Sequence, residues 1–266
     1  MPELPEVETI KRELTTKILG KKILDIKINQ PKVIKEPSLN EFKKELIGQV
    51  PEKIIRKAKV LIIEFKQDKF LIIHLRIAGW LLYGKEDEKA RVIFKLAGGK
   101  CLNYMDSRLL GELRLRKDYR DLKFIKELGP EPFDLSLAKF REIIKSKKTR
   151  IKVLLMDQKI ISGIGNIYAQ EALFLSKILP QRQACSLSDK ETNVLYEKII
   201  ATLNTAIKYK GSSVDSYRDV EGEKGGMEKL LKVYGRQNEP CFICNNPVKK
   251  IALGGRGTCF CPRCQK

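Results

Sequence analysis

The sequence predicts an α+β protein in which a β-rich N-terminal half with one leading helix precedes a helical region and a C-terminal cysteine module. Three observations support this class. Residues 22–115 contain short β-rich runs, residues 137–210 have helical texture, and five of the seven cysteines lie in the last 26 residues. A chain of 266 residues is long enough for two domains, each with its own core.

The leading helix is predicted from apolar residues that recur at helical spacing: Val7, Ile10, Leu14 and Ile18. We expect it to begin near Pro5 and to stop at Gly20. Residues 59–75 predict two strands around a "KQDK" turn, and residues 91–105 predict two more around "AGGK". This half is therefore expected to form a β-sandwich or a barrel.

The best candidate domain boundary is "LGPEPFDLSL", because two prolines and a glycine interrupt the pattern there. The helical texture that follows gives way to a polar, glycine-containing stretch that is long enough for a mobile functional loop. The predicted organisation is an N-terminal domain, a hinge, a helical domain that includes this loop, and the cysteine module: 1–128, 129–138, 139–236 with loop 211–226, and 237–266.

Charge is the most informative part of the composition. Lys and Arg total 53 against 33 Asp and Glu, which gives a net charge of +20. Such a surplus favours a polyanionic partner such as nucleic acid, although lysine-rich solvated faces are the plainer alternative. No run of about 18 apolar residues predicts a membrane span, and charges interrupt the first twenty residues. We expect a cytoplasmic protein without a membrane partner.

The cysteine module has the spacing C-x2-C-x16-C-x2-C, formed by Cys241, Cys244, Cys261 and Cys264. Four thiolates at such spacing predict one structural zinc ion, with a disulfide pair as the alternative. Cys259 does not fit this register and is expected to be a free thiol. "GGRGT" between the two pairs predicts a hairpin turn that presents Arg256 either to a phosphate or DNA groove or simply to solvent.

An interior motif, "GIGNIY", opens a predicted helix. Gly163 and Gly165 permit a tight turn with exposed amides, and a helix N-terminus attracts phosphate. Asn166 either caps this helix or binds phosphate itself, and local sequence favours the cap. The motif alone is weakly specific.

In their order and spacing, these segments resemble the bacterial formamidopyrimidine-DNA glycosylase family along nearly the whole chain. The matching segments are "MPELPEVET", "RKAK", "IIHL", "YMDSR", "LGPEP", "LMDQKIISGIGNIYAQEALF", "VYGR" and the four-cysteine segment ending in "CQK". The resemblance implies an N-terminal β-sandwich, a helix–two-turn–helix domain and a zinc finger, with damaged double-stranded DNA as the partner of a monomer. It also implies excision of oxidised purines followed by strand cleavage through β- and δ-elimination, in bacterial cytoplasm at the nucleoid.

The resemblance further implies roles for individual residues. Catalysis would fall to Pro2 as nucleophile once Met1 is removed, to Glu3 as acid–base partner, and to the supporting Glu6 and Lys59. DNA contacts, including those that fill the space left by the flipped nucleotide, would come from His74, Ile77, Arg108, Leu110, Lys152, Asn166, Tyr234 and Arg256. The loop at 211–226 would cover the flipped base.

The proposed chemistry suits an N-terminal proline. A typical α-amino group titrates near 8 and a lysine near 10.4, so more of the former is unprotonated at neutral pH. Proline is more basic than that average, and the start of a helix together with Lys59 would lower its pKa. Its imine is an iminium that keeps its charge and serves as an electron sink. Glu3 could protonate the sugar ring oxygen and move protons later. The alternative for "PELPE" is a proline-initiated helix with acidic residues in its first turn.

His74 is the single histidine. A lone histidine beside a strand is usually a satisfied core residue, but the resemblance favours a phosphate contact. It is not a candidate general base.

The chain departs from the family pattern in two segments. The family's "HLGMSG" is "HLRIAG" here, and "DPRRFG" is "DSRLLG", so that Ile77 and Leu110 replace a methionine and a phenylalanine wedge. Apolar wedges of either kind can unstack bases, so the mechanical role is expected to survive with altered lesion or partner-base preference. Trp80 is interpreted as a packing residue, with a substitute wedge as the alternative.

Two rival functions remain. One is the sister endonuclease VIII-like branch, which prefers oxidised pyrimidines; "MPELPE" and Arg108 favour purines instead. The other is a DNA-binding zinc protein without catalysis, against which Pro2, Glu3 and Lys59 argue.

Overall fold

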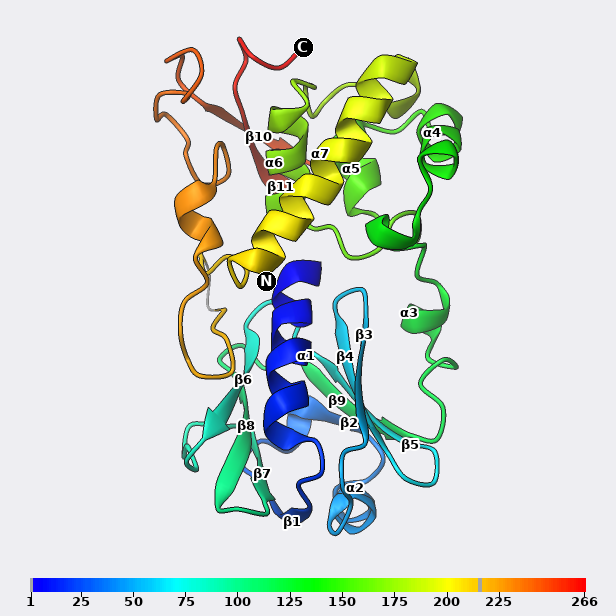
Figure 1. The fold of residues 1–266 in the computed structure, drawn as a ribbon, viewed down its shortest axis with the longest axis vertical. Coiled ribbons are helices and arrows are strands. Elements are labelled where there is room, and N and C mark those ends of the chain that lie inside the picture. The colour runs from blue at the N-terminus through cyan, green and yellow to red at the C-terminus, as the bar shows by residue number, and fades with distance from the viewer. Residues whose placement is uncertain (1, 215–216) are drawn as a thin grey trace. The chain divides into compact units, whose positions relative to one another are not determined.

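The computed structural model describes residues 2–214 and 217–266 (Figure 1). The chain forms two compact units. Unit 1 comprises Met1–Lys126 together with Tyr209–Glu228, and unit 2 comprises Glu127–Lys208 together with Lys229–Lys266. The described residues of the segment 211–226, which the sequence placed with the helical domain, therefore belong to the N-terminal unit. An α+β protein with a β-rich N-terminal half is confirmed.

Unit 1 is built on two sheets. One has the order β1-β7-β8-β6, with antiparallel neighbours, and the other has the order β2-β9-β5-β4-β3, in which only β2 and β9 run parallel. The strands of the first sheet are Ile23–Ile28, Gly79–Gly84, Val92–Leu96 and Lys100–Asp106 for β1, β6, β7 and β8. Those of the second are Ile34–Glu36, Lys53–Lys57, Val60–Phe65, Lys69–His74 and Glu112–Arg116 for β2, β3, β4, β5 and β9.

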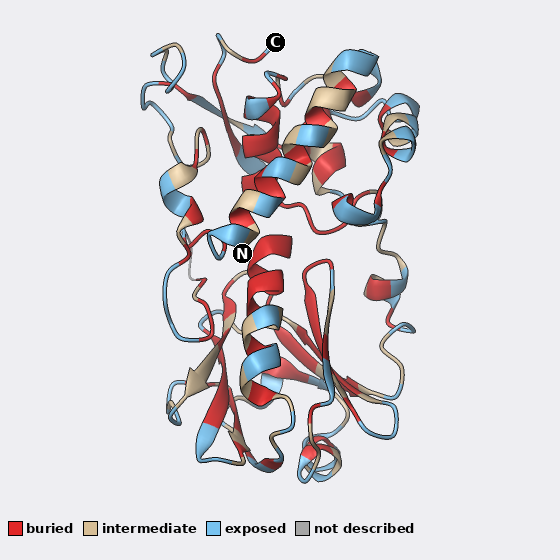
Figure 2. Ribbon diagram, viewed as in Figure 1, coloured by how far each residue is buried: buried red, intermediate tan, exposed pale blue. Residues whose placement is uncertain are grey.

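Helix α1 (Leu4–Ile18) belongs to the core of unit 1. Its apolar face shares one buried cluster with strands from both sheets (Figure 2). The predicted positions Val7, Ile10, Leu14 and Ile18 are all buried, because their 3–4-residue spacing places them on one face. The helix begins at Leu4 rather than at Pro5, since Glu3 takes the N-cap position. Two short helices, α2 (Leu39–Leu46) and α3 (Lys123–Lys126), complete unit 1.

Tight turns join the paired strands as the sequence predicts. Gln67 and Asp68 both have positive φ between β4 and β5, and Gly98 and Gly99 do so between β7 and β8. Between β3 and β4 the pair Lys57↔Val60 closes a two-residue turn, so Lys59 occupies a hairpin tip.

Unit 2 is helical and ends in a β-hairpin. Its helices are α4 (Leu137–Ser146), α5 (Ile151–Met156), α6 (Asn166–Leu175) and α7 (Asp189–Lys208), and the hairpin pairs β10 (Lys249–Leu253) with β11 (Arg256–Phe260). Short 3-10 turns lie at Pro31–Val33 in unit 1, at Pro132–Asp134 and Ala184–Ser186 in unit 2, and at Met227–Leu230. Helix α6 is buried along nearly its whole length, which makes it the centre of unit 2.

Gln265 and Lys266 are part of the fold of unit 2. The Gln265 side chain accepts the Cys261 N–H at 2.8 Å and donates to the Ile178 carbonyl at 2.8 Å. The Lys266 N–H donates to the Lys177 carbonyl, and the Lys266 carbonyl accepts the Leu179 N–H. These bonds attach the cysteine module to the end of α6.

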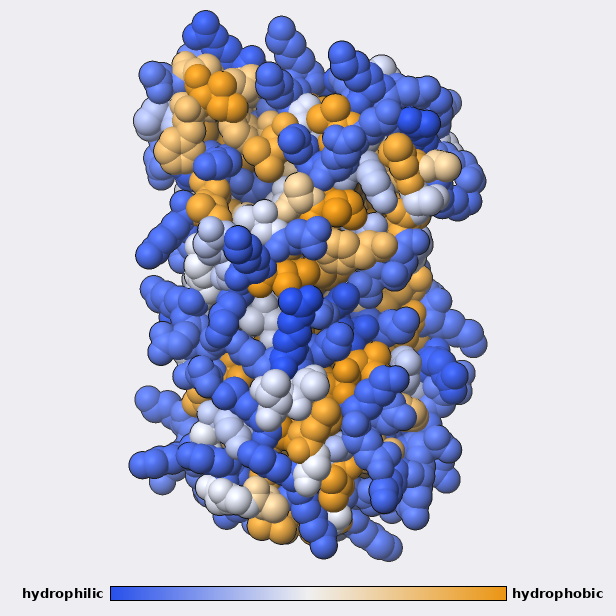
Figure 3. All heavy atoms as spheres, in the orientation of Figure 1, coloured by the Kyte–Doolittle hydropathy of each residue, from blue (hydrophilic) through white to orange (hydrophobic). Residues whose placement is uncertain are grey.

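Hydrophilic side chains cover most of the face drawn in Figure 3, as expected for a strongly charged chain. Within the described residues, no helix combines the length and apolar character needed to cross a membrane.

Candidate functional site

The start of α1 brings together the N-terminal residues singled out in the sequence. Pro2 and Glu3 are buried, and the Glu3 N–H donates to the Glu6 carboxylate at 2.7 Å. The other Glu6 oxygen accepts the Ser212 N–H at 2.8 Å. Glu6 thus holds both the residue that follows Pro2 and the beginning of the 211–226 loop. Met1, whose removal the resemblance implies, lies outside the described residues.

The hairpin that carries Lys59 is held in place by an ion pair between Arg56 and Glu8, which the sequence did not reveal. Arg56, at the end of β3, donates to the Glu8 carboxylate on α1 at 2.9 Å and to the Ala58 carbonyl at 3.2 Å. Burial alone would raise the pKa of Glu8, but hydrogen bonds from Arg56 and Arg12 outweigh it and leave the pKa below its usual range. A charged Glu8 therefore locks the hairpin that carries Lys59 against α1.

His74, the last residue of β5, is neutral. Burial, reinforced by the positive charge of Arg76, lowers its pKa to about 3. Its Nδ1 accepts the Arg76 N–H at 3.2 Å, which assigns the proton to Nε2. His74 is thus a half-buried, uncharged N–H donor. This state is compatible with a contact to a phosphate oxygen, and it gives His74 no role as a general base.

Two loops emerge side by side from the paired ends of β5 and β9, where His74 lies opposite Glu112. The 75–78 loop carries Ile77, and the 107–111 loop carries Arg108 and Leu110. The buried Asp106 carboxylate organises the second loop by accepting backbone N–H groups from Arg108, Leu109 and Gly111 at 2.7–3.0 Å. Leu110 is 49% exposed. The loops therefore present an arginine and two apolar side chains at the same end of β5 and β9.

Gly111 is required at the end of the 107–111 loop. A Cβ at this position would lie 1.9 Å from the Tyr104 hydroxyl and 3.1 Å from the His74 carbonyl oxygen. A side chain there would have to displace the Tyr104 hydroxyl and would crowd the His74 carbonyl.

The described parts of the 211–226 loop are anchored to α1. The Lys210 ammonium contacts Glu13 at 2.7 Å and the buried Asp219 at 3.0 Å, and these carboxylates raise its pKa. Asp219 also accepts the N–H groups of Glu221 and Glu223. The Val220 N–H donates to Glu13, so α1 supports the loop at both Glu6 and Glu13.

In unit 2, Asn166 is the first residue of α6. The cap predicted for it is wrong, because Gly165 takes the N-cap position and frees the Asn166 side chain for other contacts. Its Nδ2 donates to the Gly257 carbonyl at 3.3 Å, and its Oδ1 accepts from Gln170 at 3.0 Å. Gly163 has φ +93°, which supplies the predicted tight turn.

Two buried residues of α6 that sequence reasoning missed connect the candidate DNA-binding residues of unit 2. The Glu171 carboxylate accepts backbone N–H groups from Lys232, Val233 and Tyr234 at 2.7–3.0 Å. Burial raises its pKa against the opposing effect of these three donors. Gln170 accepts the Cys259 N–H at 2.6 Å and donates to the Gly257 carbonyl. Both residues lie within the quoted motif as "AQE", but the sequence does not reveal these long-range bonds.

Lys152, the second residue of α5, is fully buried, and its backbone N–H donates to the Pro180 carbonyl at 3.3 Å. Arg256 opens β11 directly after the Gly254–Gly255 turn and is exposed, as the sequence predicted. Since Gln170 and Asn166 hold the neighbouring Gly257, α6 fixes the hairpin that presents Arg256.

The four predicted ligand cysteines converge. The sulfur atoms of Cys241, Cys244, Cys261 and Cys264 all lie within 4.8 Å of one another, and none forms a disulfide. Cys244 and Cys261 are 3.4 Å apart, and Cys241 and Cys264 are 3.9 Å apart. A tetrahedral ion with bonds of about 2.3 Å would place its sulfurs about 3.8 Å apart, so this cluster fits a metal ion of that kind. Cys259 is a buried free thiol outside the cluster, as predicted.

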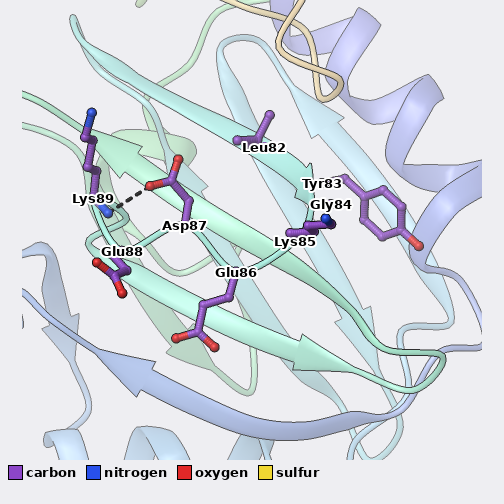
Figure 4. Close-up of a pocket in the computed structure, with 8 residues that line it drawn as sticks. All are labelled: Leu82, Tyr83, Gly84, Lys85, Glu86, Asp87, Glu88 and Lys89. Atoms are coloured by element: carbon purple, nitrogen blue, oxygen red, sulfur yellow. Dashed lines mark hydrogen bonds between the residues drawn. The ribbon is translucent and has the colours of Figure 1, made fainter.

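Trp80 packs rather than projects. It lies on β6 opposite Met105 and joins a small apolar cluster with Ile93 and Cys101, which confirms the packing interpretation. A shallow hollow lies near the other end of β6, lined by Leu82–Lys89 (Figure 4). Asp87 accepts the Lys89 N–H there, and none of the candidate site residues lines it.

Taken together, a β-sandwich whose buried N-terminus bears Pro2 and Glu3, a helical unit and a four-cysteine hairpin define the class of zinc-finger DNA-repair glycosylases. Models of the formamidopyrimidine-DNA glycosylase N-terminal domain, the formamidopyrimidine-DNA glycosylase H2TH domain, and the zinc finger found in FPG and IleRS match residues 1–113, 128–218 and 238–266. The chain belongs to the formamidopyrimidine-DNA glycosylase family.

Relatives and solved structures agree along the full length. Formamidopyrimidine-DNA glycosylases of Cytobacillus firmus and of Bacillus anthracis are 43% and 39% identical, with coverage of 100% of this chain and 100% and 99% of theirs. A Lactococcus lactis Fpg variant bound to Fapy-dG-containing DNA matches with a TM-score of 0.92 at 37% identity, and Lactococcus lactis Fpg bound to abasic-site DNA matches with 0.92 at 36%. Both structural matches cover 100% of each chain.

Proposed function

We propose that this chain is a bifunctional DNA glycosylase and AP lyase that excises oxidised purines, 8-oxoguanine and formamidopyrimidines, from double-stranded DNA and then cleaves the strand. The observation that carries the proposal is the arrangement at the start of α1. Glu6 binds the Glu3 N–H and the Ser212 N–H with its two oxygens, which fixes Pro2 and Glu3 beside the 211–226 loop.

In this mechanism, the Pro2 amine, freed by removal of Met1, attacks C1′ of the damaged nucleotide. The C1′–N bond breaks, its electron pair leaves with the base, and the base takes up the proton that the attacking amine loses. Glu3 protonates the ring oxygen so that the sugar opens and the nitrogen lone pair forms the iminium. The helix N-terminus and the fixed Lys59 ammonium both disfavour protonated Pro2, which favours the nucleophilic form.

The iminium then drives both strand breaks. Loss of a proton from C2′ converts the iminium into a neutral enamine, whose electrons then expel the 3′ phosphate and re-form a conjugated iminium. A second proton loss, at C4′, expels the 5′ phosphate in the same way. Water finally hydrolyses the iminium and restores the free amine. Because the iminium nitrogen of proline carries no proton, it cannot be neutralised by deprotonation and serves as the electron sink for both eliminations. Glu3 is the acid–base group for these transfers.

A base within a duplex must be extruded before attack at C1′, so backbone contacts have to hold the deformed strand. In unit 1, neutral His74 and Lys59 would contact phosphates, while Ile77, Arg108 and Leu110 fill the space that the nucleotide leaves. In unit 2, Asn166, Tyr234 and Arg256 would grip the backbone, and the buried Lys152 would lie near the active site, as the resemblance implies. The net charge of +20 supplies the general attraction. A single chain carries every group named, so a monomer suffices.

The four-cysteine cluster would hold one zinc ion. Four thiolate ligands leave no open coordination position, so the ion would be structural and would take no part in the reaction. Its role would be to keep the hairpin that bears Arg256 in place.

The experiment that tests the proposal is borohydride trapping on DNA that contains 8-oxoguanine or an abasic site. The processed enzyme is expected to form a covalent adduct with both substrates. The matched control is the same chain with its N-terminal amine acetylated, which should bind the DNA without an adduct. Absence of an adduct from the processed enzyme would exclude the catalytic function and leave a DNA-binding zinc protein. A preference for an oxidised thymine over 8-oxoguanine opposite C would exclude the purine specificity.

A further inference from the structure

An ion pair joins the 75–78 loop to Glu112, the first residue of β9, which directly follows the 107–111 loop. Arg76 Nε donates to Glu112 Oε1 at 2.9 Å, and Arg76 Nη2 makes a second contact with the same oxygen. We propose that this pair fixes the two loops as one unit, which makes Arg76 and Glu112 positioning residues for reading the base opposite the lesion. The inference rests on the proposed function, in which these loops occupy the vacated space.

The backbone conformation of Arg76 indicates that contacts of its side chain stabilise the 75–78 loop. Arg76 has φ +52°, a conformation that favours glycine and costs a larger residue free energy. A glycine would adopt this turn without that cost. The arginine therefore has to be held by contacts, and Glu112 supplies them together with the Phe124 ring, 6.0 Å from the guanidinium.

Glu112 is a fixed and charged partner. Its side chain is only 9% exposed, and Arg114 donates to its second oxygen at 2.8 and 3.0 Å. Burial alone would raise the pKa of Glu112, but the hydrogen bonds from Arg76 and Arg114 outweigh it and lower the pKa. Arg114 is held in turn by Glu36 at 2.9 Å.

The ion pair lies directly beside the residues that are proposed to fill the space left by the flipped nucleotide. Arg76 directly precedes Ile77, and Glu112 directly follows Gly111, the last residue of the loop that carries Arg108 and Leu110. The Arg76 N–H also bonds His74, which lies opposite Glu112 in the sheet. A shift of one loop is therefore transmitted to the other through a partly buried charge pair, which is screened less than an exposed one.

The test uses Arg76→Gln, Glu112→Gln and the double variant, with Glu36→Gln as the matched control. Glutamine matches glutamate in size and is shorter than arginine, and at either position it removes the charge pair, while Glu36→Gln removes a carboxylate from Arg114 and leaves Arg76 with its partner. Two measurements are made: amide hydrogen exchange of residues 75–78 and 107–111 in the free protein, and the ratio of 8-oxoguanine excision opposite C to that opposite A.

Each single variant is expected to speed exchange in both loops and to change the excision ratio about fivefold, with the double variant no further from the parent than either single one. Glu36→Gln should leave the ratio unchanged. Unchanged exchange, exchange altered in one loop only, or an unchanged ratio would each overturn the inference. If the parent excises nothing, the proposed function has failed, and the exchange data still decide whether the pair couples the loops.

Discussion

The Glu6 carboxylate and the Ser212 N–H are hydrogen-bonded at 2.8 Å although 206 residues separate them in sequence. The same carboxylate holds the Glu3 N–H, so one side chain sets the positions of the N-terminal residues and of the segment that follows α7. Gly211 makes this approach possible, since a Cβ there would lie 2.6 Å from the Glu6 oxygen.

Glu6→Gln should weaken this junction. A glutamine has one acceptor oxygen where Glu6 uses two, so one buried N–H loses its partner, at a cost of roughly 1–3 kcal/mol in the free energy of unfolding. Urea unfolding measures this loss, and single-turnover excision is expected to slow in parallel. Glu41→Gln, on an exposed face of α2, is the control and should be neutral in both assays. Equal stability of the two variants would contradict the role given to Glu6.

His74 should remain neutral throughout the physiological range. Because its pKa in the folded protein is about 3, below the ordinary 6.5, folding favours the uncharged ring. Its contribution to stability is full above about pH 6.5 and is lost as pH falls toward 3. Nitrogen NMR of the only histidine can follow this without assignment. The expected spectrum shows a proton on Nε2 from pH 5 to 8; an inflection within that range would contradict the low pKa, and a proton on Nδ1 would contradict the tautomer.

Glu171→Gln should loosen Tyr234. The Glu171 oxygens accept three backbone N–H groups, and a glutamine would turn a donor toward at least one of them. DNA binding is expected to weaken about tenfold, because an unsatisfied buried group costs roughly 1–3 kcal/mol. A titration with abasic-site DNA at fixed salt measures the effect. Glu239→Gln, which changes an exposed carboxylate that pairs with Arg236, serves as control; comparable weakening by both would point to charge alone.

Removal of one ligand cysteine should empty the cluster. Cys261→Ser is expected to lose the bound zinc and with it DNA affinity, because the Arg256 hairpin would no longer be held. Cys259→Ser is the matched control: it changes a neighbouring buried thiol that lies outside the ligand set and should keep one zinc per chain. Elemental analysis of both purified variants decides the matter. Zinc retained by Cys261→Ser, or lost by Cys259→Ser, would show that the ligand set is wrong.

Regular patterns made much of the fold predictable. The leading helix, the turns at Gln67–Asp68 and Gly98–Gly99, and the four-cysteine cluster follow from spacing and turn chemistry, which are local. Tertiary contacts were not predictable in this way. The Asn166 cap failed because Gly165 adopts the cap conformation and the side chain finds Gly257, 91 residues away.

The same limit applies to the candidate site. Motifs indicated Pro2, Glu3 and Asn166, but the groups that hold them are ordinary-looking charged residues. Glu8, Gln170 and Glu171 resemble solvated helix positions in sequence, and only the fold shows that they are shielded and bonded to distant backbone or to Arg56. A single sequence carries no signal for such long-range pairings.

The hydrogen bonds of Gln265 and Lys266 have a practical consequence for protein production. Both backbone groups of Lys266 and both polar ends of the Gln265 side chain are engaged with residues 177–179 and Cys261. An affinity tag fused directly after Lys266 would disturb these bonds, and one fused before Pro2 would convert the proposed nucleophilic amine into an amide. A removable N-terminal tag whose cleavage leaves proline as the first residue is therefore the better choice for purification.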